Sequence, residues 1–520
     1  MIKKYLLIFI LSIFATSCSK KVDFTATIKG GSPLERIEFI EASGVATLPL
    51  VNVGIGKDGK FTGGFDAPND GMYVITYAGK ENIIYLKQGQ KLEISGNGET
   101  FPQEFKIVGD AKNNNDFLQA VQKFMQNYTK NLDLQSKMSK DEKTFLAALK
   151  KIEADLMKSI DENGEKFSAD KKVIEWKKND IRTGMLSIFP QYEGFKKQSS
   201  GNPAFKISKE FADYEESLQK DKELLVKEHP AYRTYLLTKM SEDFSKFAEG
   251  KTKGLTIQPT TSELFAEYLK KRTELSDTAK DYLLAYIISQ ADLQPTATQE
   301  VQDKIGKIID ADIKDASIKK DLKTIQFAIG GLKVGEALPE ASLMTADGKP
   351  FKTADFNGKP TLLMFYASWT PYIKDQTVPI LNQVIGFYKK DMNFAFINFD
   401  DNKEQFTKTS SALMKGIPGT NYYAEGGLTG DFAKKFGIYG FKLQPSFVIV
   451  DKNGKVASRL FFNLGDPEMV TALDKATGLT APAVQQPEIQ LQNDINAPKA
   501  EAPTAEAPQN APAPAAPATK

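Results

Sequence analysis

A continuous apolar run at residues 361–366, Thr-Leu-Leu-Met-Phe-Tyr, constrains the fold of this 520-residue chain more than any other stretch. A short apolar run without polar alternation is typical of a strand that is buried on both faces of a sheet. The segment that follows contains Pro371, a residue type tolerated in the first turn of a helix. The sequence therefore predicts a buried strand that leads through a short loop into a helix.

The loop at 367–374 resembles the Trp-Cys-x-x-Cys loop of thioredoxin-like thiol reductases, most closely that of TlpA-like and redoxin lipoproteins. In that family the first cysteine is the thiolate nucleophile and the second resolves the mixed disulfide. Here Thr370 and Ile373 occupy these two positions, so both redox positions are degenerate. A threonine hydroxyl is a weak nucleophile without an adjacent base. The resemblance therefore implies a thioredoxin-like fold, and we expect a redox-inactive domain with no catalytic residue, not an enzyme.

The resemblance to redoxins covers residues 334–479. The segment 334–339, Val-Gly-Glu-Ala-Leu-Pro, matches the beginning of redoxin domains, and the apolar segments 393–399 and 446–451 are expected to add a parallel and an antiparallel strand. Met364 lies near the position where some thioredoxins keep a buried carboxylate. Strand, helix and strand in this order predict an α/β sheet with helices on both faces.

Gln444-Pro445 lies where the family keeps a cis-proline beside the cysteine pair. The resemblance implies a cis bond at Pro445; a trans proline at the start of a strand is the alternative. With Trp369, Pro371 and Tyr372, these residues form a candidate groove that would bind an extended peptide through main-chain hydrogen bonds and side-chain pockets. A loop that repacked after losing its cysteines remains the other interpretation.

The N-terminus resembles a lipoprotein signal peptide. Lys3 and Lys4 precede an apolar stretch at 5–14 and a small-residue cleavage site at 15–17. Cys18, the only cysteine, follows directly, and the apolar run is too short for a permanent membrane span. An ordinary secretory signal with a stray cysteine is the alternative.

The resemblance implies that residues 1–17 are removed and that Cys18 carries diacylglycerol and a further acyl chain such as palmitate, so that residues 18–21 form the lipid-anchored start. Several acyl chains would hold the protein on a membrane almost permanently. The segment 19–21, Ser-Lys-Lys, lacks the acidic surface-export signature of some lipoproteins. We therefore expect an outer-membrane anchor that faces the periplasm.

Between the anchor and the redoxin-like region, two different periodicities follow each other. Residues 22–109 alternate apolar and polar side chains in short runs with turn residues such as Asp58-Gly59, which predicts an all-β, sandwich-like module. Residues 113–329 change to a helical period and predict a helical domain. Within them, Thr260 and Glu263 have the spacing of a capping box that starts a helix.

Composition excludes several classes of function. The chain has 68 Lys and Arg against 66 Asp and Glu, a net charge of +2, which gives no argument for nucleic-acid binding. His229 is the only histidine, and a zinc site needs several ligands, so we expect no metal, no cofactor and a plain helix-end role before Pro230. Residues 480–520 are rich in Pro and Ala and are expected to form a disordered tail.

These features predict a multi-domain chain with an N-terminal all-β module, a helical middle and a C-terminal α/β thioredoxin-like domain. The expected function is protein or peptide binding in the cell envelope, either by the protein alone or as a subunit of an outer-membrane assembly. The expected partners are membrane lipid at Cys18 and an envelope protein. The alternative that resemblance alone suggests is a TlpA-like thiol-disulfide oxidoreductase. Two cysteines would be needed for it, and the chain has one.

Overall fold

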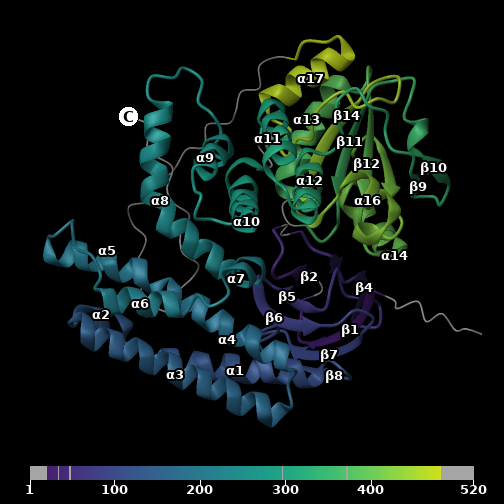
Figure 1. Cartoon of the computed structure of the whole chain (residues 1–520). Helices are drawn as coiled ribbons and strands as arrows, with labels where there is room; N and C mark the ends of the chain where they lie inside the picture. The colour runs from purple at the N-terminus through teal and green to yellow at the C-terminus, as the bar shows by residue number, and fades with distance from the viewer. Residues whose placement is uncertain (1–19, 33, 46–47, 295–296, 371–372, 482–520) are drawn as a thin grey trace, which may run out of the picture.

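The computed structural model describes residues 20–32, 34–45, 48–294, 297–370 and 373–481. Strands, then helices, then a mixed α/β region follow one another along the chain, as the sequence predicts (Figure 1). The expected signal peptide, the anchor residue Cys18 and nearly all of the expected tail lie outside the described residues.

Among the described residues of the N-terminal region, the chain forms two four-stranded sheets, in the orders β4-β1-β7-β8 and β3-β2-β5-β6. Their core lies between the sheets, where Phe24 and Phe39, from different sheets, bring their ring centroids within 4.8 Å. In the first strand every second side chain is buried, so the alternation read from the sequence reports the inward face. The strands are β1 (Lys21–Lys29), β2 (Ile37–Glu41), β3 (Val51–Val53), β4 (Phe61–Asp66), β5 (Gly71–Tyr77), β6 (Lys80–Leu86), β7 (Lys91–Asn97) and β8 (Phe105–Val108).

The middle of the chain is helical. Its helices are α1 (Lys112–Lys130), α2 (Leu134–Ser139), α3 (Glu142–Phe167), α4 (Lys171–Leu186), α5 (Ile188–Ser200), α6 (Lys209–Ser217), α7 (Lys222–Glu228), α8 (Pro230–Thr252), α9 (Thr261–Lys270), α10 (Asp277–Ile287), α11 (Gln299–Asp312) and α12 (Ala316–Gly330). The predicted capping box is present at the start of α9, where the Thr260 side chain accepts from the Glu263 amide and the Glu263 side chain accepts from the Thr260 amide.

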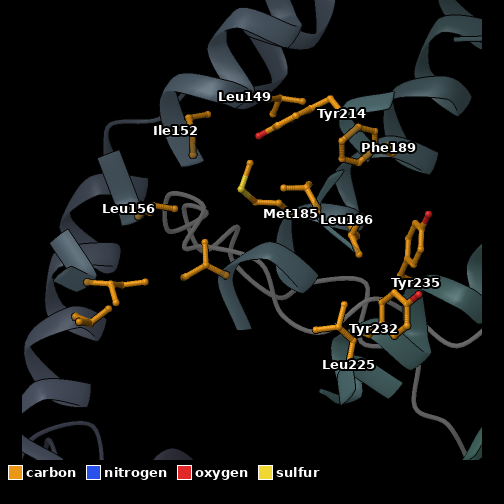
Figure 2. Packing of buried hydrophobic residues seen from close by; sticks show 14 of the residues in the cluster. Leu149, Ile152, Leu156, Met185, Leu186, Phe189, Tyr214, Leu225, Tyr232 and Tyr235 are labelled. Atoms are coloured by element: carbon orange, nitrogen blue, oxygen red, sulfur yellow. The ribbon is translucent and has the colours of Figure 1, made fainter. Parts of the chain in front are cut away.

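Two apolar cores hold the helices together. In the first, Leu149, Ile152 and Leu156 on α3 lie toward Met185 and Leu186 on α4 (Figure 2). Spacings of three and four residues place each set on one helix face. The same core includes side chains of β5 and β6, so the helices and the β module share buried surface. The second core joins α9 to α12.

The C-terminal region contains a six-stranded sheet in the order β10-β9-β13-β12-β11-β14. In the central strand β11 all six residues are buried, with Leu363 and Phe365 in the core on one face and Leu362, Met364 and Tyr366 in the core on the other. This confirms the strand buried on both faces. The elements are β9 (Ser342–Thr345), β10 (Pro350–Lys352), β11 (Thr361–Tyr366), α13 (Val378–Tyr388), β12 (Asn393–Asn398), α14 (Lys403–Gln405), α15 (Ser411–Leu413), β13 (Thr420–Tyr423), α16 (Asp431–Phe436), β14 (Ser446–Val450) and α17 (Pro467–Thr477).

The β module lies between the first helices and the C-terminal sheet (Figure 1). On the helical side, the buried Asn115 of α1 fixes Tyr85 of β6: its Oδ1 accepts from the Tyr85 amide at 2.8 Å and its Nδ2 donates to the Tyr85 carbonyl at 2.9 Å. A buried amide that satisfies both backbone groups of one residue orients the two elements in a specific way. The contact with the C-terminal domain involves the loop that follows β11.

Two further findings concern the helices and the potential metal ligands of the described residues. None of their helices combines the length and the apolar character that crossing a bilayer requires. No group of three or more His, Cys, Asp or Glu side chains among these residues is arranged to hold a metal ion.

Candidate functional site

The loop that follows β11 lies at one edge of the C-terminal sheet. Strands β11 and β12 are parallel, so their carboxyl ends meet there, and β14 begins beside them because Ser446 pairs with Phe365. The loop residues 367–370, the Asp400-Asp401 pair after β12 and Gln444-Pro445 before β14 therefore gather at this edge. Pro371 and Tyr372 of the candidate groove lie outside the described residues.

Neither degenerate redox position offers a reactive group to solvent. Thr370 is 7% exposed, and its hydroxyl donates to the Ala367 carbonyl at 2.6 Å. Ile373 is 1% exposed and packs in the core beneath the sheet with Leu381 and Ile385 of α13. The hydroxyl is used to close a turn and the isoleucine fills core volume, so both positions have structural roles here.

A buried carboxylate lies directly behind the loop. Asp400 has no exposed surface, and its Oδ1 accepts from the Ser368 amide at 2.7 Å and from the Ser368 hydroxyl at 2.8 Å. Burial raises the pKa of Asp400, and the bonds from Ser368 and Asn398 oppose that rise by favouring the charged form. This carboxylate lies just after the end of β12, whereas Met364 on β11, which is near the position where some thioredoxins keep a buried carboxylate, is apolar core.

Arg36 of the β module covers the loop. Its guanidinium carbon lies 4.2 Å from the centroid of the Trp369 ring, in cation–π geometry. The same guanidinium binds Asp401 at two points, with Nη1 donating to Oδ2 and Nη2 donating to Oδ1, both at 2.7 Å. A two-point arginine–carboxylate pair adds directional specificity to the charge attraction. The Arg36 side chain is only 9% exposed and that of Asp401 25%.

Neighbouring residues of the β module hold Arg36 in place. Asn52 on β3 accepts from Arg36 Nε through its side chain and from Nη2 through its carbonyl, and its amide donates to Glu38 on β2. Gly54 allows the close approach: a Cβ there would lie 2.6 Å from Asp401 Oδ2 and 2.8 Å from Arg36 Nη1. We call Arg36, Asn52, Trp369 and Asp401 the Arg36 clamp.

The expectation of a cis bond at Pro445 is wrong. The cis peptide bond among the described residues is Phe101–Pro102, and Gln444–Pro445 is trans. The chain reaches Pro445 directly out of a short 3₁₀ turn at Gly440–Leu443, and a trans bond is the more stable form for most X-Pro pairs. Pro445 is buried and Gln444 is exposed. The expected cis geometry of thioredoxin peptide grooves is therefore not present here.

The candidate groove is covered on its Trp369 side. The indole Nε1 of Trp369 is buried without a hydrogen-bond partner among the described residues, while Arg36 lies over the ring. An extended peptide would have to displace Arg36 to contact this ring. His229 lies elsewhere, between α7 and α8, and the structure confirms its helix-end position before Pro230.

Sequence analysis missed Arg36, Asp400 and Asp401. The two aspartates were within reach, because they directly follow a predicted parallel strand and so must lie at the same sheet edge as the loop. Arg36 carried no such signal: it precedes an ordinary strand in a different module, 365 residues from its partner.

Part of the chain is similar to known proteins. Residues 333–468 match the family model described as Redoxin. The thioredoxin-like protein HCF164, chloroplastic, from Arabidopsis thaliana is 32% identical over 75 residues, which is 14% of this chain and 28% of that relative. The chain thus spans little more than a quarter of that relative's length.

Solved structures of two bacterial proteins also match part of the chain. The thioredoxin domain of a thiol-disulfide oxidoreductase from Bacteroides vulgatus is 18% identical, with 28% of this chain and 99% of that chain covered and a TM-score of 0.24. A thiol-disulfide oxidoreductase from Bacteroides fragilis is 22% identical, with 26% and 99% covered and a TM-score of 0.23. The family match and the strand order lead to one conclusion: residues 333–468 form a redoxin domain with a thioredoxin-like fold.

Proposed function

We propose that this protein is a lipid-anchored envelope protein whose redoxin domain serves protein binding and carries out no thiol–disulfide exchange. The observation that carries the proposal is the state of the two redox positions, since Thr370 hydrogen-bonds its own loop and Ile373 is core. Exchange requires a thiolate that attacks and a second sulfur that leaves or resolves. The only sulfur of a cysteine in the chain is that of Cys18.

The edge of the sheet that bears the degenerate loop serves as an internal interface. The Arg36 clamp joins the β module to the redoxin domain there, and a surface ion pair between Lys57 and Glu404 lies at the same junction. A loop held in this way supports the arrangement of two modules and leaves other surfaces of the domain for a partner.

An apolar helix face supports protein binding by the redoxin domain. Ile380 and Phe387 on α13 are each 40% exposed, and Val384 between them is partly buried. Spacings of four and three residues place the three side chains along one face of the helix. Exposed apolar side chains gathered on one face are typical of protein contact surfaces. We propose an envelope protein as the occupant of this face, because the lipoprotein-like N-terminus would hold the chain at a membrane.

The experiment is a mild-detergent pull-down of the tagged full-length protein, compared with the Phe387→Asp variant. Asn382→Asp on the same helix is the matched control, since Asn382 is exposed and polar and lies two residues from both Ile380 and Val384, on a different face of α13. A partner that co-purifies in stoichiometric amount with the wild type and the control, and that is lost with Phe387→Asp, is the expected result. No enriched partner, or equal recovery with all three proteins, would refute binding through α13.

The anchor is tested separately by metabolic labelling with palmitate and by membrane fractionation. Cys18→Ser is expected to abolish the label and to release the protein from the outer-membrane fraction, because two or more acyl chains provide the attachment. An unlabelled wild-type protein would overturn the lipoprotein assignment without affecting the redox argument.

A further inference from the structure

A cavity of about 320 Å³ lies where the β module meets the helices, away from the Arg36 clamp. Its wall includes the end of β2 and the start of β5 on one side and residues of α4, α7, α10 and α12 on the other. No residue of the redoxin domain contributes to it. The volume falls at the lower end of the range for small-molecule sites, which also favour positions between domains.

A buried arginine builds one side of this cavity. Arg233 of α8 is 3% exposed and donates to the Val226 carbonyl at 2.7 Å and to the Ser43 carbonyl at 2.6 Å, with further bonds to the carbonyls of Gly44 and Lys227. These bonds join the loop after β2 to the last turn of α7. Because backbone carbonyls occupy its donors, Arg233 shapes the wall without pairing with the carboxylates that line the cavity.

Those carboxylates are unpaired. Glu41, Asp70, Glu228 and Asp321 line the cavity together with Lys172 and Lys227, so the six charges sum to −2. Among the described residues none of these six side chains takes part in an ion pair. The carboxylates of Glu228 and Asp321 also accept no hydrogen bond from these residues. Both lysines are solvent-exposed, whereas Glu41, Glu228 and Asp321 are partly buried. The cavity therefore holds a net negative charge whose carboxylates make no direct ion pair among the described residues.

The pKa values of Asp321 and Glu228 are both raised, which is consistent with carboxylates that are partly buried and make no ion pair. Burial raises the pKa of Asp321 to about 6, and the nearby charge of Glu41 adds to the rise. Burial also raises the pKa of Glu228, although Lys172 opposes the rise. A cation placed among these groups would supply the missing counterion and would favour their charged forms.

Two aromatic rings complete the lining. The ring of His229 lies tilted by 30° against that of Trp176, at 5.0 Å between centroids, and the guanidinium of Arg233 lies over the Tyr282 ring, at 4.2 Å from its centroid. Both rings also line the cavity. Aromatic faces attract organic cations and pack against their methylene groups, which inorganic cations do not possess.

We propose that this cavity binds a small organic ammonium ion, with Glu228 and Asp321 pairing with protonated amines and Trp176 and Tyr282 packing against the carbon chain. The sum of −2 favours a short diamine, in which two ammonium groups neutralise the lining. This site does not depend on the proposed protein-binding function, because it shares no residue with α13 or with the clamp.

The test is isothermal titration of the full-length protein with putrescine (1,4-diaminobutane) at pH 7.5 and constant ionic strength. One saturable site is expected. Glu228→Gln and Asp321→Asn are each expected to weaken binding about tenfold or more, since each removes one charge-assisted contact. Glu223→Gln, the same change at an exposed position of α7 outside the cavity, should leave the affinity within about twofold.

Butane-1,4-diol, with the same carbon chain and no charge, is expected to give no saturable heat. Circular dichroism and thermal melting identify any variant that fails to fold. If one of the two carboxylate variants fails to fold, the affinity of the other still tests the proposal. Absence of saturable binding to the wild type, equal binding of the diol, or unchanged affinity in both carboxylate variants would overturn the proposal.

Discussion

Arg36 and Asp401, which are 365 residues apart in the chain, form a two-point ion pair between the β module and the redoxin domain, with both N–O distances at 2.7 Å. The guanidinium also covers the Trp369 ring. One side chain of the β module thus fixes the position of the loop that would be catalytic in a redox-active relative. Thr370 and Ile373, which occupy the two redox positions without a thiol, lie at the same edge of the sheet as this internal contact.

The strength of this pair is the first prediction. Arg36→Ala should destabilise the junction by about 2–3 kcal/mol, because it leaves the partly buried Asp401 without its counterion. Asp401→Ala should cost a similar amount, and the double variant should cost much less than the sum of the two. Urea unfolding followed by Trp369 fluorescence in a Trp176→Phe background measures these differences.

The control for this double-mutant comparison of Arg36 and Asp401 is Lys57→Ala at the same junction. Lys57 and Glu404 form an ion pair with side chains 71% and 60% exposed, and such surface pairs contribute about 0–1 kcal/mol. Additive effects of Arg36→Ala and Asp401→Ala would mean that the two side chains do not interact in solution.

Gly54 provides a steric test of the same contact. A Cβ on residue 54 would come within 2.6 Å of Asp401 and within 2.8 Å of Arg36, so Gly54→Ala should displace the pair and destabilise the junction by about 1–3 kcal/mol. Gly184→Ala is the control: that helical glycine has open space around it, and alanine there should be neutral or stabilising. Equal melting curves for both variants would place Gly54 away from the clamp.

His229 should make stability depend on pH in the acidic range. It is 1% exposed, and burial lowers its pKa from 6.5 to about 4, so the folded protein keeps the imidazole neutral. Between these values the unfolded chain binds the proton more readily, and stability therefore falls as pH drops from about 6.5 to 4, by on the order of 3 kcal/mol. Asp321, with a pKa raised to about 6, acts in the opposite direction over about pH 6 to 4.

Comparison of the wild type with His229→Phe at each pH isolates the histidine, because the other groups cancel in the difference. Phenylalanine keeps an aromatic ring against Trp176. The variant should gain stability relative to the wild type as the solution is acidified. A difference that stays constant from pH 7 to pH 4.5 would show that the imidazole is not buried in the neutral form.

Lys442 should make stability rise with pH in the alkaline range, in the same direction as His229 does in the acidic range. Its side chain has no exposed surface, its Nζ has no hydrogen-bond partner among the described residues, and burial lowers its pKa from 10.5 to about 7. The unfolded chain binds the proton between these values, so stability rises as pH increases from 7 to 10.5. Lys442→Met should be more stable than the wild type at pH 7, by on the order of 3 kcal/mol, and the advantage should shrink towards pH 10. Urea titrations at both pH values measure it; a less stable variant at pH 7 would contradict the burial of an unpaired amine.

Local patterns accounted for much of the fold. The apolar run 361–366 identified the central strand, and the spacing of Thr260 and Glu263 identified the start of α9, because each depends on neighbours in the chain. The resemblance predicted a cis bond at Pro445, but the bond is trans and follows a short 3₁₀ turn. The Arg36 contact and the cavity between the β module and the helices could not be predicted, because both arise from contacts between modules that no local period encodes.

The central claim is that the β module closes the degenerate redox loop through Arg36. Acrylamide quenching of Trp369 fluorescence, in the Trp176→Phe background that leaves one tryptophan, tests it most directly. We predict weak quenching in that background, at least a twofold larger quenching constant with Arg36→Ala, and no change with Lys57→Ala. Two results would contradict the account. One is quenching in the Trp176→Phe protein as strong as that of an exposed indole, and the other is a quenching constant that Arg36→Ala leaves unchanged.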